Sequence, residues 1–207
     1  MKLHSAVYCA ACLVLVLSAC APAFKRVTDT ATPVVANGFS LMPPKGDYWF
    51  QMDNTGSQMV VFGKSTPDDF KQIRSLVLTA QTLRATEKND IRSQDGLKAE
   101  VDANVRQPVP RHRLVAYQSE SYQDEIRRTD CVRVSATNEE RNNPNYPGKV
   151  FLISGKMWFC RHPSEPKMVV LVGYSERRPT DLSSMIDEAV LKECEDTVNS
   201  LRFLPLH

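Results

Sequence analysis

The chain has 207 residues, which is enough for one ordinary domain and accessory segments. Its composition, 42% hydrophobic and 24% charged, is typical of a globular protein rather than a disordered or fibrous one. Its 26 basic and 24 acidic residues give a formal net charge of +2. A charge so close to zero produces no long-range field that would steer the domain onto nucleic acid or anionic lipid, so we exclude nucleic acid as a partner.

The amino terminus has the pattern of a secretory signal. A basic start at Lys2 precedes residues 6–17, which run without a charged side chain. A membrane-spanning helix needs about 20 apolar residues, so this run is too short to remain in a bilayer. It fits the apolar region of a signal peptide, which we predict over residues 1–19.

The signal ends in Leu17-Ser18-Ala19-Cys20, which resembles the lipobox of bacterial lipoproteins. The resemblance implies diacylglycerol on the Cys20 sulfur, cleavage before Cys20 and acylation of its new amino group. Several acyl chains, at about 0.8 kcal/mol per buried CH₂, make such an anchor permanent for practical purposes. Because Ala21 rather than Asp follows, the resemblance implies an outer-membrane lipoprotein facing the periplasm, or a cell-membrane one in a Gram-positive source. The alternative is an ordinary secreted protein with a cysteine near its cleavage site.

The segment after the signal lacks periodicity, and we predict a lipidated tether over 20–37 and a single domain over 38–207. Residues 38–42 and 59–63 alternate or cluster apolar side chains and predict two strands. Thr66-Pro67-Asp68-Asp69 suits the start of a helix, whereas residues 76–83 are aliphatic and β-branched. We therefore expect one helical turn followed by a strand.

The second half of the domain is predicted as one helix, a run of strands and a final helix. Residues 93–106 place apolar side chains at four-residue steps, with Ser93 as the cap. The last helix is predicted over 181–201, capped by Asp181 and followed by a short pairing segment at Phe203 and Leu204. Strands are predicted over 114–120, 130–136, 150–160 and 168–175, the last two forming a hairpin with a long turn at 161–167.

This order predicts an α+β fold: a single antiparallel sheet with a long C-terminal helix and a shorter middle helix packed on one face. The opening Gly38-Phe39-Ser40-Leu41-Met42-Pro43-Pro44 and the closing helix with Ser200-Leu201-Arg202-Phe203 are similar to the ends of the PsbP/Mog1-like α+β fold. Because that fold hosts unrelated roles, mostly in binding and assembly, the resemblance implies little about chemistry.

Signal removal and lipidation reduce six cysteines to three: Cys131, Cys160 and Cys194. An oxidising compartment favours a disulfide, and three single bridges are possible. We prefer Cys131–Cys160, because both residues lie on predicted strands and Cys131 is off the face formed by the neighbouring valines. Cys194 lies on the apolar stripe of the last helix, where a cysteine behaves as a small apolar residue.

Three short clusters combine chemically useful side chains. Cys160-Arg161-His162, with His112 elsewhere, could form a nucleophile–base pair or a metal site, but it lacks a second ligand pair and a disulfide would abolish both roles. Residues 174–178 could bind an anion through Arg177 or simply end a strand in solvent. Residues 47–50 could plug the core or form an aromatic ligand platform. We predict no metal and no cofactor.

The sequence contains no Gly-x-Ser-x-Gly, no phosphate-binding glycine loop and no His-Glu-x-x-His. We therefore predict a non-catalytic envelope lipoprotein, held by membrane lipid through Cys20, that binds an envelope protein or helps to assemble an envelope structure. The alternative is a small-ligand or metal binder that uses the hairpin turn around His162 together with Arg177. A hydrolase is the third hypothesis.

Overall fold

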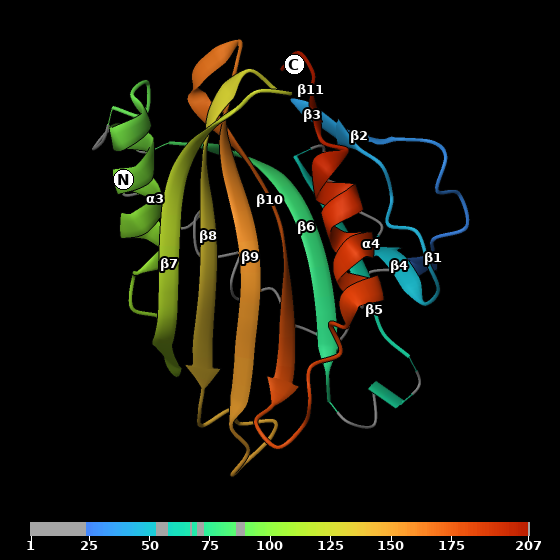
Figure 1. Ribbon diagram of the computed structural model, residues 1–207. Coiled ribbons are helices and arrows are strands. Elements are labelled where there is room, and N and C mark those ends of the chain that lie inside the picture. Colours follow the sequence, from blue (N-terminus) through green and yellow to red (C-terminus); the bar gives the residue numbers. More distant parts are fainter. Residues whose placement is uncertain (1–23, 53–57, 67, 70–72, 86–89, 207) are drawn as a thin grey trace.

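The computed structural model describes residues 24–52, 58–66, 68–69, 73–85 and 90–206, so the predicted signal peptide and Cys20 lie outside the described residues. Eight antiparallel strands form the large sheet in the order β1-β4-β5-β6-β10-β9-β8-β7, and three form a small sheet in the order β11-β3-β2 (Figure 1). The strands are β1 (Phe24–Arg26), β2 (Val34–Ala36), β3 (Phe39–Leu41), β4 (Trp49–Met52), β5 (Met59–Lys64), β6 (Ser75–Arg84), β7 (His112–Asp124), β8 (Thr129–Glu140), β9 (Phe151–His162), β10 (Glu165–Pro179) and β11 (Arg202–Phe203). The helices are α3 (Gln94–Val105) and α4 (Glu188–Asn199).

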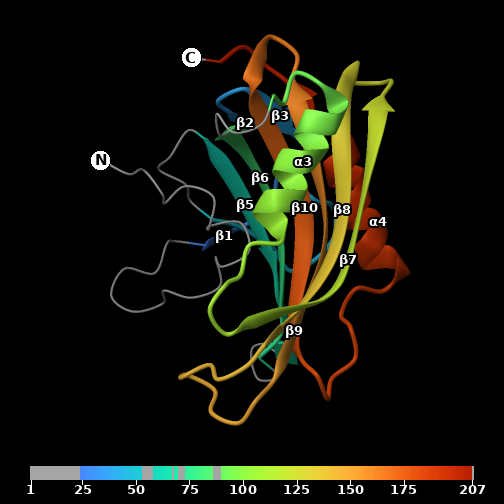
Figure 2. The ribbon, with the colours of Figure 1, turned by 90° about the vertical axis from the view of Figure 1, so that its left-hand side faces the viewer.

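The two helices pack on opposite faces of the large sheet (Figure 2). We call the face that carries α4 the front face and the other the back face. On the front, α4 and the small sheet cover one core, which contains Phe39, Leu78, Val172 and Cys194. On the back, α3 covers a second core, which contains Leu97, Val132, Val134 and Leu171.

From β7 to β5 across the sheet, the side chains on the front face change from polar to apolar. Residues directly opposite each other on neighbouring strands point to the same face. One row from β7 to β5 is Glu120, Arg133, Trp158, Val172, Ala80 and Val60, and the next is Gln118, Ser135, Lys156, Tyr174, Leu78 and Phe62. Each row is apolar where α4 covers it and polar over β7 and β8, where no helix lies on the front (Figure 1).

The predicted α+β fold class is wrong, because the described residues are mostly in β-strands and the helices are short and differently placed. The described residues form two sheets, and the two helices among them, α3 and α4, have 12 residues each, so α4 is not a long C-terminal helix beside a shorter middle one. The helices do not share a face, because β10 buries Val169 and Leu171 toward one core and Val170 and Val172 toward the other. A strand that is apolar on both faces requires a cover on each.

The sequence predicts the last helix over 181–201, with Leu182 as its first apolar position. In the structure α4 begins six residues after Leu182, at Glu188. Asp187 caps it by accepting a hydrogen bond from the Val190 N–H at 2.8 Å. The residues before it are tied to β10, since the Glu176 carboxylate accepts hydrogen bonds from Ser184 Oγ at 2.8 Å and from Met185 N at 2.5 Å. This buried acceptor holds the segment outside the helix despite its apolar spacing.

Most predicted strands are present, and several are longer than predicted. The strand predicted over 76–83 is β6, and the middle helix with its Ser93 cap is α3. The hairpin of β9 and β10 is tighter than predicted, because only Pro163 and Ser164 separate the two strands. Residues 67 and 70–72 of the predicted helical turn lie outside the described residues.

The segment predicted as a tether contributes strands to the fold. β1 pairs with β4 through Phe24 and Met52, and β2 pairs with β3 through Val35 and Ser40. Trp49, in the aromatic cluster, is 1% exposed and belongs to the front core, as the core-plug interpretation of that cluster proposed. The folded part of the chain therefore begins before Gly38.

Candidate functional site

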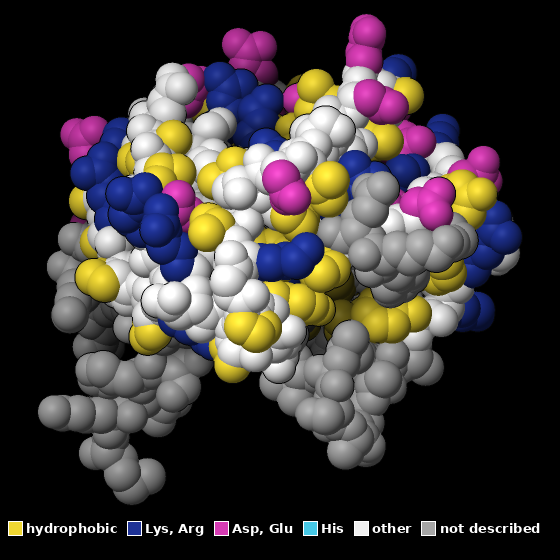
Figure 3. Space-filling view, turned by 90° about the horizontal axis from the view of Figure 1, so that it is seen from below, with side chains coloured by type: hydrophobic (Ala, Val, Ile, Leu, Met, Phe, Trp, Pro, Cys, Tyr) yellow, Lys and Arg dark blue, Asp and Glu magenta, His cyan; other side chains and the backbone are white. Residues whose placement is uncertain are grey.

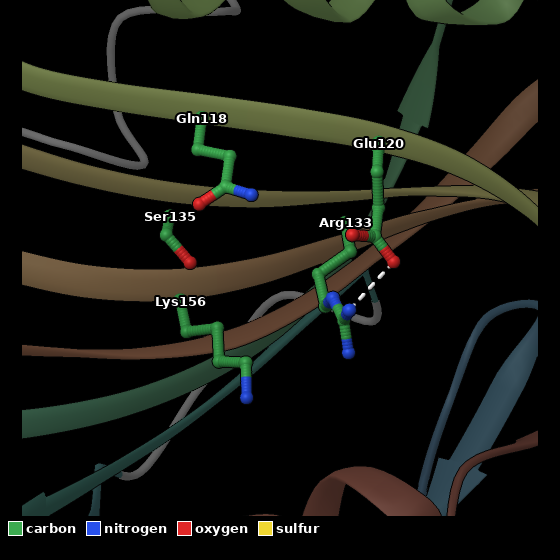
Figure 4. Close-up of a pocket in the computed structure, with 5 residues that line it drawn as sticks. All are labelled: Gln118, Glu120, Arg133, Ser135 and Lys156. Carbon is green, nitrogen blue, oxygen red and sulfur yellow. Dashed lines mark hydrogen bonds and ion pairs between the residues drawn. The ribbon is translucent and has the colours of Figure 1, made fainter.

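A shallow pocket of about 180 Å³ opens on the uncovered polar half of the front face. Its lining consists of Gln118 and Glu120 from β7, Arg133 and Ser135 from β8 and Lys156 from β9 (Figure 4). Strand alternation puts all five side chains on one face, because each is paired with, or two residues from, another of the set. The sheet therefore builds this pocket without any loop.

The charged groups around the pocket are paired. Glu120 Oε1 lies 2.5 Å from Arg133 Nη2, and Lys156 Nζ lies 3.1 Å from Glu195 Oε1 of α4. The Lys156 ammonium also lies 5.3 Å from the centre of the Trp158 ring. The two cations and two anions sum to zero, so the pocket has no surplus charge.

Two polar groups of the pocket are free to bind. Gln118 and Ser135 are exposed, and neither side chain hydrogen-bonds to another of the described residues. In Figure 4 both side chains project into the same space as Lys156. The amide supplies donors and an acceptor, and the hydroxyl supplies one donor and two lone pairs.

A second polar cluster joins α3 to β7 on the back face. Asp102 accepts hydrogen bonds from Tyr117 Oη and Ser119 Oγ, the latter at 2.7 Å, while Lys98 Nζ lies 2.5 Å from the Asp102 carboxylate and 2.7 Å from Ser119 Oγ. Lys98 on α3 and Ser119 on β7 both bind the Asp102 carboxylate, so the cluster docks the helix onto the sheet.

Asp102 gives the stability of the fold a pH dependence. Burial alone would raise the pKa of Asp102, but hydrogen bonds from Lys98, Tyr117 and Ser119 together lower it below its ordinary value. A carboxyl with a lowered folded-state pKa stabilises the fold above the unfolded pKa of about 3.9, and this contribution is lost as the pH falls through the folded pKa. We expect Asp102→Asn to lose less free energy of unfolding than the wild type between pH 5 and pH 2, measured by urea unfolding. An equal loss in both proteins would contradict this assignment, and Asp181→Asn in an exposed loop is the control.

His162 is a structural residue whose ring nitrogens are already hydrogen-bonded within the fold. It is 1% exposed, and its Nε2 lies 2.9 Å from the Leu204 carbonyl oxygen and 3.2 Å from that of Gly38. Its Nδ1 accepts a hydrogen bond from the Ser164 backbone N–H at 3.3 Å, so Nε2 carries the proton that is donated to the carbonyls. Both ring nitrogens are occupied in holding the chain end to the β9–β10 turn.

Replacing His162 should loosen the carboxy-terminal segment. His162→Phe removes the donor to the partly buried Leu204 carbonyl and leaves that acceptor without its protein partner, which costs about 1–3 kcal/mol of unfolding free energy. The amide of Leu204, which donates to the Gly38 carbonyl, should exchange with deuterium faster in the variant. Unchanged exchange at Leu204 would show that β11 is held by other contacts.

Arg177 lies far from His162, so the structure does not form the joint site that we predicted as the alternative. His162 pairs with Glu165 at the turn of the hairpin, whereas Arg177 pairs with Ile153 near its open end. Arg177 is 5% exposed, donates from Nε to Glu140 at 2.8 Å and lies 3.6 Å from the centre of the Phe151 ring. It is part of a buried ion pair, not a solvent-exposed anion site.

The predicted disulfide is confirmed. Cys131 and Cys160 are directly opposite each other on β8 and β9 and are bonded, with 4.1 Å between their Cα atoms. Cys194 is a free thiol in the front core, and burial raises its pKa to about 12. A thiol that stays protonated at neutral pH is a poor nucleophile. A disulfide at Cys160 removes the predicted roles of the Cys160–His162 cluster.

The remaining surfaces carry less information. Among the described residues, no group of three or more His, Cys, Asp or Glu side chains could hold a metal ion, and no helix is long and apolar enough to cross a bilayer. Figure 3 shows hydrophobic side chains around a hollow, seen from below. We assign no ligand to this hollow.

Sequence reasoning missed the pocket on β7, β8 and β9. The alternation of Val132, Val134 and Ala136 with Arg133 and Ser135 on β8 was a usable signal, because it gives β8 one apolar and one polar face. Which polar residues of β7 and β9 lie beside that face depends on strand register, and the alternation of one strand does not determine the register of its neighbours.

Comparison with known proteins shows a likeness among solved structures. No protein-family model matches the sequence, and no curated protein is similar to it. A solved structure to which the chain is similar is LpqN, described as involved in cell envelope biogenesis of Mycobacterium tuberculosis. The alignment covers 84% of this chain and 90% of LpqN, with 11% sequence identity and a TM-score of 0.46. The resemblance of the chain ends to the PsbP/Mog1-like fold stays a prediction.

Proposed function

We propose that this protein is a lipid-anchored, non-catalytic binding module of the bacterial cell envelope, and that it binds through the open polar half of its front face. The lipobox residues Leu17 to Cys20 support the anchor, and Ala21 supports placement in the outer membrane with the domain facing the periplasm. The domain then acts from a fixed membrane position, where even a modest affinity is effective because anchor and ligand are confined together.

One observation carries the binding role: no helix covers the front face over β7 and β8, where the pocket lies. The large sheet buries the β10, β6 and β5 part of its front under α4 and leaves the β7 and β8 part open. Gln118 and Ser135 lie in this open part with unused hydrogen-bonding groups. Both are exposed on a regular sheet, so binding requires little ordering of the chain.

The absence of an activated nucleophile in the described clusters supports a non-catalytic role. The Ser119 hydroxyl donates to the Asp102 carboxylate, which holds α3 to β7, and Cys194 is a buried thiol with a raised pKa. The alternative, a small-ligand binder, now concerns only the pocket. His162 is bonded to the Leu204 carbonyl and Arg177 is paired with Glu140. The predicted partner class, an envelope protein or structure, is a hypothesis that the following experiment addresses.

Site-specific photo-crosslinking in intact cells tests the proposal. Benzoylphenylalanine at Ser135 or Gln118 should form a discrete adduct, either with a protein or with material that fractionates with the cell wall. The matched controls are Lys192 on α4 and Ala103 on α3, which are exposed outside the open half of the front face. Adducts at the controls as strong as those at Ser135, or none at any position, would refute the assignment of this surface.

A further inference from the structure

We propose that the pocket formed by Gln118, Glu120, Arg133, Ser135 and Lys156 binds one sugar unit of an uncharged glycan. This inference rests on the proposed function and names the ligand class of its binding surface. The charge of the pocket, the hydrogen-bonding groups it offers and its size each point to this ligand.

The charge balance favours an uncharged ligand. Glu120 with Arg133 and Lys156 with Glu195 form two ion pairs, at 2.5 and 3.1 Å. A phosphate or carboxylate ligand would have to compete with Glu120 or Glu195 for its cation, and would lie near the displaced carboxylate. A cationic ligand would have to compete with Arg133 or Lys156 for its carboxylate, and would lie near the displaced cation. A neutral ligand leaves both pairs intact.

The pocket offers donors and acceptors side by side, which is what a hydroxyl group requires. A hydroxyl donates one hydrogen bond and accepts others, so it can bridge the Gln118 amide and the Ser135 hydroxyl, which are directly opposite on β7 and β8. The paired Arg133 retains N–H groups and Glu120 retains lone pairs for further bonds. Hydrogen bonds to charged groups are about twice as strong as those between neutral groups. A ring with several hydroxyls can use all of these groups at once.

The size and surroundings of the pocket favour one unit of a longer chain. Pockets for complete small molecules usually have about 300–1,000 Å³, and this one has about 180 Å³. It opens to solvent over β7 and β8, where no helix lies on the front face, so a longer chain can continue from it across the β7 edge of the sheet (Figure 1). Trp158, which follows Arg133 in its row and is partly exposed, adds an apolar surface beside the polar rim. Sugars present C–H and O–H groups on different sides of the ring and can contact both.

Isothermal titration calorimetry on the full chain tests this ligand class. The protein is purified from membranes in a polyoxyethylene detergent, whose headgroup carries no sugar. The probes are three uncharged tetrasaccharides, of β-1,4-linked N-acetylglucosamine, α-1,4-linked glucose and β-1,4-linked mannose. Tetragalacturonate serves as the anionic probe and an uncharged tetrapeptide as the peptide probe. At least one uncharged tetrasaccharide should bind with a saturable isotherm and more tightly than either of the other two probes.

Variants locate the binding. Gln118→Leu and Ser135→Ala should each raise the dissociation constant about fivefold, the effect of losing one hydrogen bond. The matched control is Gln123→Leu on the same strand, whose side chain is exposed at the other end of β7 and should change the constant less than twofold. Circular dichroism confirms that each variant is folded. Failure of all three sugars to bind, tighter binding of the anion or the peptide, or equal effects at Gln118 and Gln123 would each overturn the proposal.

The result is separable from that of the crosslinking experiment. If Ser135 crosslinks to a protein in cells and no sugar binds, the binding surface is correct and the ligand class is wrong. If a sugar binds the purified protein through Gln118 and Ser135 but no adduct forms in cells, the pocket binds sugar without serving the proposed envelope role.

Discussion

Glu140→Gln is expected to lower the free energy of unfolding by about 3–5 kcal/mol, although glutamine preserves the shape of the side chain. Glu140 and Arg177 are 3% and 5% exposed and are paired at 2.8 Å, so the substitution leaves a guanidinium buried without a counter-charge. Asn143 also donates to Glu140 Oε1 at 2.8 Å and holds the loop after β8 against the sheet. Arg177→Met should cost a similar amount because it leaves the carboxylate buried.

The double variant Glu140→Gln with Arg177→Met distinguishes a charge effect from a packing effect. Removing both charges should restore most of the stability, because burial of a charge pair carries a desolvation cost that neutral side chains avoid. The exposed pair Glu120–Arg133, with side chains 47% and 41% exposed, is the control: Glu120→Gln should cost less than about 1 kcal/mol. Urea unfolding at pH 7 measures the wild type and the four variants. If the loss of unfolding free energy in the double variant equals the sum of the losses in the two single variants, the ion pair is not the cause of those losses.

Removing the disulfide is expected to lower the free energy of unfolding by a similar amount, through the entropy of the unfolded chain. Cys131 and Cys160 are 29 residues apart, and a crosslink of that span lowers the entropy of the unfolded chain by the equivalent of about 3–4 kcal/mol in the chain-entropy model. Cys131→Ala with Cys160→Ala should therefore lower the unfolding free energy by about this amount. The loss should be absent when wild type and variant are compared under strongly reducing conditions.

Thiol counting checks the same bond without a substitution. Over the described residues, the folded protein should expose no reactive thiol, because Cys194 is buried and its pKa is raised to about 12. Denaturation without reductant should release one thiol, and denaturation with reductant should release three. Peptide mapping assigns them. Three thiols in the unreduced, denatured protein would contradict the crosslink.

The sequence was informative wherever a strand is polar on one face. The alternation on β8 predicted both the strand and the position of Cys131 off its valine face, and the disulfide follows from that position. The sequence misled where apolar spacing suits more than one structure. Leu182, Met185 and Ile186 have helical spacing, but hydrogen bonds to the buried Glu176 hold this segment outside α4.

The helix placement and the pocket depend on contacts between distant residues. The run Val169 to Val172 has no period of two, and only strand pairing reveals that it is the centre of a sheet with a core on each face. Glu120, Arg133 and Lys156 belong to three strands whose registers determine that they are neighbours. Arg177 and His162 are separated for the same reason, since they lie toward opposite ends of one hairpin.

The central claim is that the open half of the front face is occupied when the protein is in its envelope. A single cysteine introduced by Ser135→Cys measures this directly, through its rate of reaction with a hydrophilic maleimide in intact cells and in the purified protein. The account predicts at least tenfold slower labelling in cells than in solution, with no such difference for Lys192→Cys on the exposed side of α4. Equal protection at the two positions, or labelling of Ser135→Cys as fast in cells as in solution, would contradict it.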